Sequence, residues 1–114
     1  IEDREMIYNP NIVKVVTDKQ NYALYFSRSV IPFNRDSQID IKYYRHIGVY
    51  AYLPECLQHF VSLSPSILER IEKLEQLRAL ENGIPIKMIE TGYQGIGIDT
   101  PQDLKIIEKL ISSI

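Results

Sequence analysis

The run IKYYRHIGVYAYL, residues 41–53, constrains the fold most, because its β-branched and aromatic residues predict the longest strand of the chain. An Arg-His pair interrupts this run, and charge inside a buried strand is costly unless it has a partner or a function. In an extended chain, successive side chains lie on opposite faces. The sequence thus predicts a core face with Ile41, Tyr43, Arg45, Ile47, Val49, Ala51 and Leu53, and an aromatic, hydrogen-bonding face with Lys42, Tyr44, His46, Gly48, Tyr50 and Tyr52.

Helices are expected to follow this strand. Pro54 opens a short helical stretch, and the segment after it predicts a complete helix over residues 69–82. Ser66 and Glu69 form a possible capping box before this helix, and Gly83 stands where a helix stop is expected. Strands alternating with helices indicate an α/β layered fold.

The remaining segments fit that architecture. Residues 12–17 and 22–27 predict a β-hairpin, and the polar loop 31–40 is expected to be exposed. Residues 84–91 predict a further strand, and a last helix is expected over roughly 101–112.

Length and charge exclude several classes. The 114 residues suit one domain, and a net charge of −2 with scattered Lys and Arg makes nucleic acid an unexpected partner. No apolar run approaches the roughly 20 residues that span a bilayer, so no membrane association is expected. A single cysteine, Cys56, precludes an intramolecular disulfide and suits the cytoplasm, and we expect it to be buried. The chain begins without Met, which suggests an incomplete piece.

Glu75 and Gln76 are candidate binding residues on the expected helix. A period of 3.6 residues places Glu75 beside Ile71 and Ala79, on or next to the apolar stripe. A carboxylate there either holds something polar or is an edge residue whose head reaches water. Gln76 follows on a more polar face, where a solvated side chain is the simpler interpretation.

Arg45 and His46 allow two interpretations each. Arg45 on a core face is typical of a structural ion pair or of a side chain that extends to solvent. His46 is either a satisfied half-buried histidine or part of a hydroxyl-rich niche with Tyr50, beside the space that Gly48 leaves open.

The segment GIGIDTP precedes the last expected helix. A phosphate loop fits it poorly, because the helix opens with TPQD and no Lys follows. Asp99 could instead offer an oxygen ligand to a divalent cation, or it could cap the helix. No Cys/His cluster suits zinc, and no local signature suggests a Ser-His-Asp arrangement.

Taken together, NPNIVKVV, ALYFSRSVIP, YYRHIGVYAY, LERIEKLEQLRAL and GIGIDTPQDL resemble, in order, the C-terminal half of the 3-deoxy-manno-octulosonate (Kdo) cytidylyltransferases. The resemblance runs from Asn9 to about Leu110. It implies the C-terminal part of a Rossmann-like nucleotide-diphospho-sugar transferase fold: a mixed sheet flanked by helices, with a β-hairpin extension used for dimerisation. Residues 1–114 are thus expected to be half of one domain.

The resemblance also implies an activity and a site. CTP and Kdo would give CMP-Kdo and pyrophosphate with Mg²⁺, for lipopolysaccharide synthesis, and Asp99 matches the family aspartate that binds the metal. Residues that match the lining of the sugar-acid site are Arg28, His46, Tyr50, Glu75 and Gln76, with Arg45 structural or one layer behind.

One departure from the family pattern leaves alternatives open. The family's CTP-binding loop, its cytosine-recognition segment and a second metal aspartate lie in its N-terminal half, and nothing in these residues replaces them. The chain alone is therefore expected to be inactive, and a homodimer is expected through the hairpin and the loop 31–40. A non-catalytic sugar-acid-binding or dimerisation module, or a cytidylyltransferase for another sugar acid, stays open.

Overall fold

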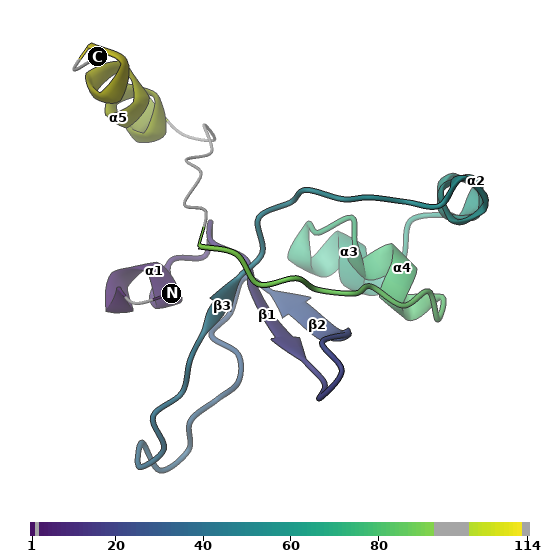
Figure 1. Ribbon diagram of the computed structural model, residues 1–114, viewed down its shortest axis with the longest axis horizontal. Coiled ribbons are helices and arrows are strands. Elements are labelled where there is room, and N and C mark those ends of the chain that lie inside the picture. Colours follow the sequence, from purple (N-terminus) through teal and green to yellow (C-terminus); the bar gives the residue numbers. More distant parts are fainter. Residues whose placement is uncertain (2, 93–100, 113–114) are drawn as a thin grey trace.

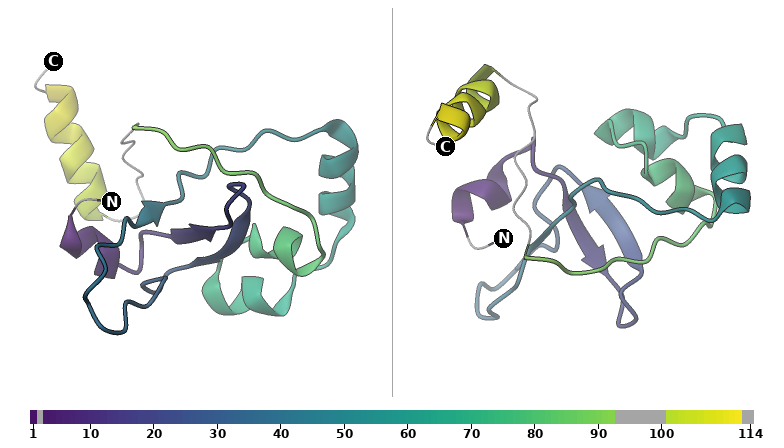
Figure 2. Two further views of the ribbon diagram at one scale, coloured as in Figure 1. Left: turned by 60° about the horizontal axis from the view of Figure 1, so that its bottom comes forward. Right: turned by 45° about the horizontal axis from the view of Figure 1, so that its top comes forward.

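The computed structural model describes residues 1, 3–92 and 101–112. The elements in chain order (Figure 1) are α1 Arg4–Tyr8, β1 Lys14–Thr17, β2 Ala23–Ser27, β3 Tyr44–Arg45, α2 Pro54–Ser62, α3 Ile67–Glu72, α4 Leu77–Glu81 and α5 Pro101–Ser112. Two further views in Figure 2 show α3 and α4 close to the β1–β2 hairpin, whereas α5 stands away from the sheet.

The predicted hairpin is confirmed. Strands β1 and β2 pair antiparallel, with Val15 opposite Phe26. The Asp18 carboxylate accepts hydrogen bonds from the backbone N–H groups of Gln20 and Tyr22, both at 2.9 Å, and Asn21 has a φ of 67°. Asp and Asn favour such turns, because their side chains bond nearby backbone and tolerate the left-handed region.

The long strand over residues 41–53 does not form, which corrects the prediction. In the described residues the sheet has the order β2-β1-β3 with antiparallel pairs only, and β3 spans just two residues. The His46 N–H adds one further bond to the Val13 carbonyl, at 2.8 Å. Beyond it Gly48 has a φ of 72°, which turns the chain out of strand geometry.

The predicted core face of this run is also wrong. Val49 and Leu53 are 84% and 67% exposed, whereas Tyr44 packs against the core and His46 contacts the fully buried Phe26. A ladder of only two residues does not hold the later residues in alternation with the first ones.

The core lies between the β1–β2 hairpin and the α3–α4 pair. Phe26 and Leu77 have no exposed surface, and their contact region joins the sheet to the helices. Burial of such side chains contributes about 1.5–3 kcal/mol each. The buried cluster consists of Val15, Ala23, Phe26, Leu74 and Leu77.

The single helix expected over residues 69–82 is broken into α3 and α4. The break occurs at Lys73, which has a φ of 57°. Two donors of Arg28 bind the helix-end carbonyls there, Nε to Glu72 at 2.8 Å and Nη2 to Lys73 at 3.2 Å. These bonds satisfy carbonyls that a continuous helix would satisfy itself, and the break lets both Leu74 and Leu77 enter the core.

The capping box predicted from Ser66 and Glu69 is present at the start of α3. Its stronger half is the backbone N–H of Ser66, which donates to Glu69 Oε2 at 3.0 Å. Glu69 therefore anchors the first turn of α3.

The segment 84–91 is not a strand. It makes one isolated bridge, between Lys87 and Tyr22, and Ile86 and Met88 pack against the core from an otherwise irregular backbone. Its backbone hydrogen bonds reach only the start of β2 and the turn before it: the Ala23 N–H donates to the Ile86 carbonyl at 2.8 Å, and the Met88 N–H donates to the Asn21 carbonyl at 2.7 Å.

The other elements need few corrections. Helices α2 and α5 match the predicted stretches, the short helix α1 was not predicted, and the loop 31–40 is largely exposed as expected. Cys56 is exposed on α2, contrary to the prediction that it is buried. None of the helices in the described part of the chain is both long and apolar enough to span a bilayer.

Candidate functional site

Five ring side chains form a continuous row from the core to α2, here called the aromatic row. It starts at Phe26 on β2, continues through the extended segment after β3, and ends on α2. Neighbouring rings lie within the separation at which aromatic pairs attract one another. The centroid separations are 4.9 Å for Phe26–His46, 5.2 Å for His46–Tyr50, 5.8 Å for Tyr50–Tyr52 and 6.1 Å for Tyr52–Phe60.

His46 is the inner member of the row that can form polar contacts. Its ring meets Phe26 edge to face, and its Nδ1 lies 3.4 Å from Nε2 of Gln76. Burial lowers the pKa of His46, so the imidazole is neutral at pH 7. A neutral imidazole that accepts from Gln76 at Nδ1 keeps its other nitrogen as a donor.

Tyr50 and Tyr52 are the accessible part of the row, at 39% and 41% exposed. Burial raises the pKa of Tyr50, and Tyr52 and the Glu75 carboxylate raise it further. The pKa of Tyr52 is likewise raised by burial and then by Glu75. Both phenols therefore stay protonated at neutral pH, and Glu75 is close enough to act on both of them.

Glu75 lies in the turn between α3 and α4, not on an apolar stripe. Its side chain is 71% exposed, so the interpretation that its head reaches water is the one the structure supports. Ile71, expected beside it in the core, is 70% exposed because the helix is broken. Arg78 lies 3.9 Å from Glu75 and also makes a bidentate pair with Glu69, at 2.9 and 2.6 Å.

The structure thus brings together four of the residues predicted for the site: His46, Tyr50, Glu75 and Gln76. They come from two segments that are about 30 residues apart in sequence, and they meet because α4 packs on the sheet that holds β3 in place. Tyr52, Phe60 and Arg78 also belong to this cluster, and sequence reasoning did not select them. Only Tyr52 had a signal, since it shares the predicted face of His46 and Tyr50.

Arg28 is bound to the backbone in this structure. Besides its two bonds at the end of α3, Nη1 donates to the Pro10 carbonyl at 3.1 Å. Its own carbonyl accepts from the ammonium of Lys14 at 2.7 Å. A role in substrate binding would have to use the remaining guanidinium N–H groups, and it stays a prediction.

Lys14 is a buried cation that sequence reasoning missed. It has no exposed surface, and its Nζ also donates to the carbonyls of Asn9 and Ile12, at 2.9 and 2.6 Å. Burial lowers the pKa of Lys14, and the neighbouring Arg28 adds to this effect. All three ammonium donors are satisfied by backbone, which indicates a structural role.

Arg45 and Asp99 are the two remaining residues that the sequence predicted for the site. Arg45 lies in β3 opposite Lys14, consistent with a place in the sheet, and its structural role stays a prediction. Asp99 lies outside the described residues. Within residues 1, 3–92 and 101–112, no group of three or more His, Cys, Asp or Glu could hold a metal ion.

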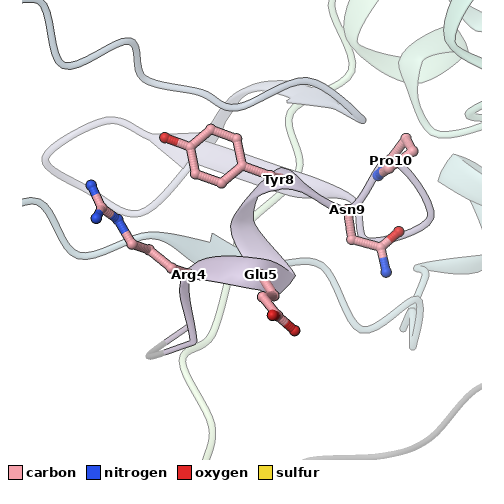
Figure 3. A pocket seen from close by; sticks show the side chains of 5 residues that line it. All are labelled: Arg4, Glu5, Tyr8, Asn9 and Pro10. Carbon is pink, nitrogen blue, oxygen red and sulfur yellow. The ribbon is translucent and has the colours of Figure 1, made fainter.

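A surface hollow of about 580 Å³ lies elsewhere, on α1 and the turn after it (Figure 3). Its lining residues are all exposed, and none belongs to the aromatic row. Since no predicted site residue lines it, we do not assign the candidate site there. The lining residues are Arg4, Glu5, Tyr8, Asn9 and Pro10.

Comparison with known proteins bears on the chemistry of this cluster. A family model described as cytidylyltransferase matches residues 1–90, which include the whole aromatic row, Glu75 and Gln76. This chain belongs to the cytidylyltransferase family.

Similar proteins within this family share one name. The chain is 54% identical to the 3-deoxy-manno-octulosonate cytidylyltransferase of Thermodesulfovibrio yellowstonii, over 99% of this chain and 46% of that protein. It is 53% identical to the protein of that name from Koribacter versatilis, over 96% of this chain and 42% of that protein. The chain therefore spans slightly less than half the length of these relatives.

A solved structure shows the same fold. It is described as CMP:2-keto-3-deoxy-manno-octonic acid synthetase complexed with CTP, and it is 39% identical with a TM-score of 0.86. The match covers 97% of this chain and 46% of that one. This similarity confirms the predicted fold class, although the sheet that the described residues form is antiparallel throughout.

Proposed function

We propose that this chain is the sugar-acid-binding part of a longer, cytoplasmic cytidylyltransferase, and that the full-length protein converts CTP and Kdo to CMP-Kdo and pyrophosphate. The observation that carries the proposal is the convergence of His46, Tyr50, Glu75 and Gln76 in a chain of this family. The names of the relatives supply the substrate class. We place residues 1–114 in the C-terminal half of the full-length domain, and the product in lipopolysaccharide synthesis.

The cluster has the donors and acceptors that such a sugar acid requires. Kdo carries one carboxylate and several hydroxyl groups. The protonated phenol of Tyr50 can donate to an oxygen, the Glu75 carboxylate can accept from hydroxyls, and the Gln76 amide can do both. The tyrosine rings add an apolar surface against which a sugar ring can lie.

The reaction requires positioning more than covalent participation by the protein. The anomeric C2 hydroxyl oxygen forms a bond to the α-phosphorus of CTP while the bond to the bridging oxygen breaks. Pyrophosphate leaves, and the hydroxyl proton passes to solvent. The residues of this chain would hold the hydroxyl in line with the phosphorus.

We propose Asp99 as the ligand that this chain provides to Mg²⁺. The described residues do not build a metal site by themselves, so the other ligands would be water, substrate oxygens and residues of the longer protein. When bound, the ion would neutralise phosphate charge. Arg28 is proposed to contribute its remaining N–H groups to the sugar acid.

A homodimer is proposed through the hairpin and the loop 31–40. Two large apolar side chains of this loop are open to solvent, Phe33 at 83% and Ile39 at 74% exposed. Exposed apolar groups of this size are typical of interaction surfaces.

The test is pyrophosphate release by the full-length protein with CTP, Mg²⁺ and Kdo, against controls with neuraminate or without sugar. Release only with Kdo supports the proposal. Release with neuraminate would indicate a different sugar acid, and no release with any sugar would favour a non-catalytic binding module.

Asp99→Asn is expected to lower kcat at least 100-fold in the same assay, because a carboxamide is a weaker ligand for a hard cation. Glu108→Gln, on the exposed face of α5, is the control for loss of one carboxylate and should keep wild-type activity. Partial recovery of the Asp99→Asn variant at high Mg²⁺ would locate the defect in metal binding. Wild-type activity in this variant would contradict the assignment.

A further inference from the structure

Arg78 joins three helices at the edge of the candidate site. It belongs to α4, its Nε and Nη2 bind both carboxylate oxygens of Glu69 on α3, and its guanidinium carbon lies 5.1 Å from the ring centre of Phe60 on α2. Both partners of the ion pair are only 13% exposed, so the pair is largely shielded from solvent. A bidentate pair in such surroundings fixes the orientation of both side chains.

The partner Glu69 is itself anchored. Besides Arg78, it accepts the backbone N–H of Ser66 at 3.0 Å, at the start of α3. Arg78 holds the pKa of Glu69 below its usual value, so this carboxylate stays charged at neutral pH. Arg78 is therefore attached to a rigid point of the helix pair.

Two members of the site depend on this anchor. Nη2 of Arg78 lies 3.9 Å from Glu75 Oε1, which restrains a carboxylate that is otherwise exposed. The guanidinium also covers Phe60, the last ring of the aromatic row, which contacts Tyr52. A planar cation over an aromatic face is attracted electrostatically to the ring.

Arg78 also fixes the break between the helices. Its bond to Glu69 holds α4 against α3 across the turn that carries Glu75 and Gln76. In this turn the backbone N–H of Arg78 donates to the Glu75 carbonyl at 3.1 Å.

We propose that Arg78 is a positioning residue for sugar-acid binding, which acts through Glu69 to fix Glu75 and the outer end of the aromatic row. This inference rests on the proposed function. This role requires the shape of the guanidinium as well as its charge. The substitution Arg78→Lys keeps the charge but loses the bidentate contact with Glu69.

The experiment compares Arg78→Lys with wild type in the full-length protein, with the exposed Arg70→Lys on α3 as the matched control. We expect KM for Kdo to rise about tenfold in Arg78→Lys while KM for CTP stays within twofold, and Arg70→Lys to match wild type. A purely structural role would lower the fraction of active protein, and hence apparent kcat, and leave KM for Kdo unchanged.

Glu69→Gln provides a second variant, because it keeps the shape and one acceptor oxygen but removes the charge. We expect an intermediate rise in KM for Kdo. In the double variant the increase should be smaller than the product of the single ones, because both changes break one interaction.

The outcomes separate the two proposals. Unchanged KM for Kdo in both single variants, with an active wild type, would overturn the role of Arg78 alone. Absence of Kdo-dependent activity in wild type would overturn the proposed function and this inference with it.

Discussion

The region around Lys14 and Arg28 and the region around Tyr50 and Glu75 differ in which groups bind their polar side chains. Around Lys14 and Arg28, donors meet backbone carbonyls of the same chain, and Lys14 has no exposed surface. Around Tyr50 and Glu75, the side chains are supported from behind by rings and by Arg78, while their polar ends remain accessible. The first arrangement stabilises the fold, and the second can bind a ligand.

This difference explains why charge alone is a poor guide to the site. A buried charged group whose hydrogen-bond donors are all bound by the protein has no donor free for a substrate. A half-exposed polar group that is held by rigid neighbours is preorganised to bind one. Variants in the first region should thus change stability, and variants in the second should change Kdo binding.

Lys14→Met tests the stabilising region with the largest expected effect. Three carbonyls lose a charged donor, so we expect the free energy of unfolding to fall by about 3 kcal/mol or more. Denaturant titration of the full-length protein would measure it, with the exposed Lys105→Met on α5 as control. A loss below about 0.5 kcal/mol, the size of an ordinary surface change, would contradict the account.

Arg28→Lys sharpens the comparison, because Arg28 was predicted for the substrate site but is bound to backbone. A lysine cannot reach the carbonyls of Pro10, Glu72 and Lys73 together, so we expect a loss of about 1–3 kcal/mol in unfolding free energy. KM for Kdo, measured on the folded variant, decides between the roles. An increase of tenfold or more would support the proposed contact of Arg28 with the sugar acid, whereas an unchanged KM would restrict Arg28 to its stabilising role.

His46 gives the smallest effect, through pH. Its pKa in the folded state lies below the ordinary value of 6.5, so the unfolded chain binds the proton more readily. His46 therefore costs no stability above pH 6.5, and stability falls as the pH drops from 6.5 toward the folded-state pKa. Free energies of unfolding of the full-length protein, measured as a function of pH, should vary less below pH 6.5 for His46→Gln than for wild type.

Local patterns predicted the elements that depend on local chemistry. The hairpin followed from two apolar runs and the Asp18 turn, and α2 and α5 from proline near their first residues. The long strand and the long helix were wrong. In the described residues the strand pairs with β1 only at Tyr44 and Arg45 before Gly48 turns the chain, and the helix is ended by Arg28, which lies more than 40 residues away in sequence.

The candidate site was predictable only in part for the same reason. His46 and Tyr50 stood out in their run, but Gln76 was chosen by resemblance alone, and periodicity left open whether Glu75 holds a polar group or reaches water. Arg78 and Lys14 carried no local signal, because a charged residue shows its importance only through the partners that the fold brings to it.

The most direct test of the central claim is the calorimetric affinity of the full-length protein for Kdo, compared between wild type, Tyr50→Phe and Tyr8→Phe. Tyr8 lines the hollow on α1 and serves as the matched control. We predict that loss of the Tyr50 hydroxyl weakens binding about tenfold, the value of one good hydrogen bond, and that Tyr8→Phe binds as wild type. Equal affinity of wild type and Tyr50→Phe, or weakening by Tyr8→Phe alone, would contradict the assignment of the sugar-acid site to the aromatic row.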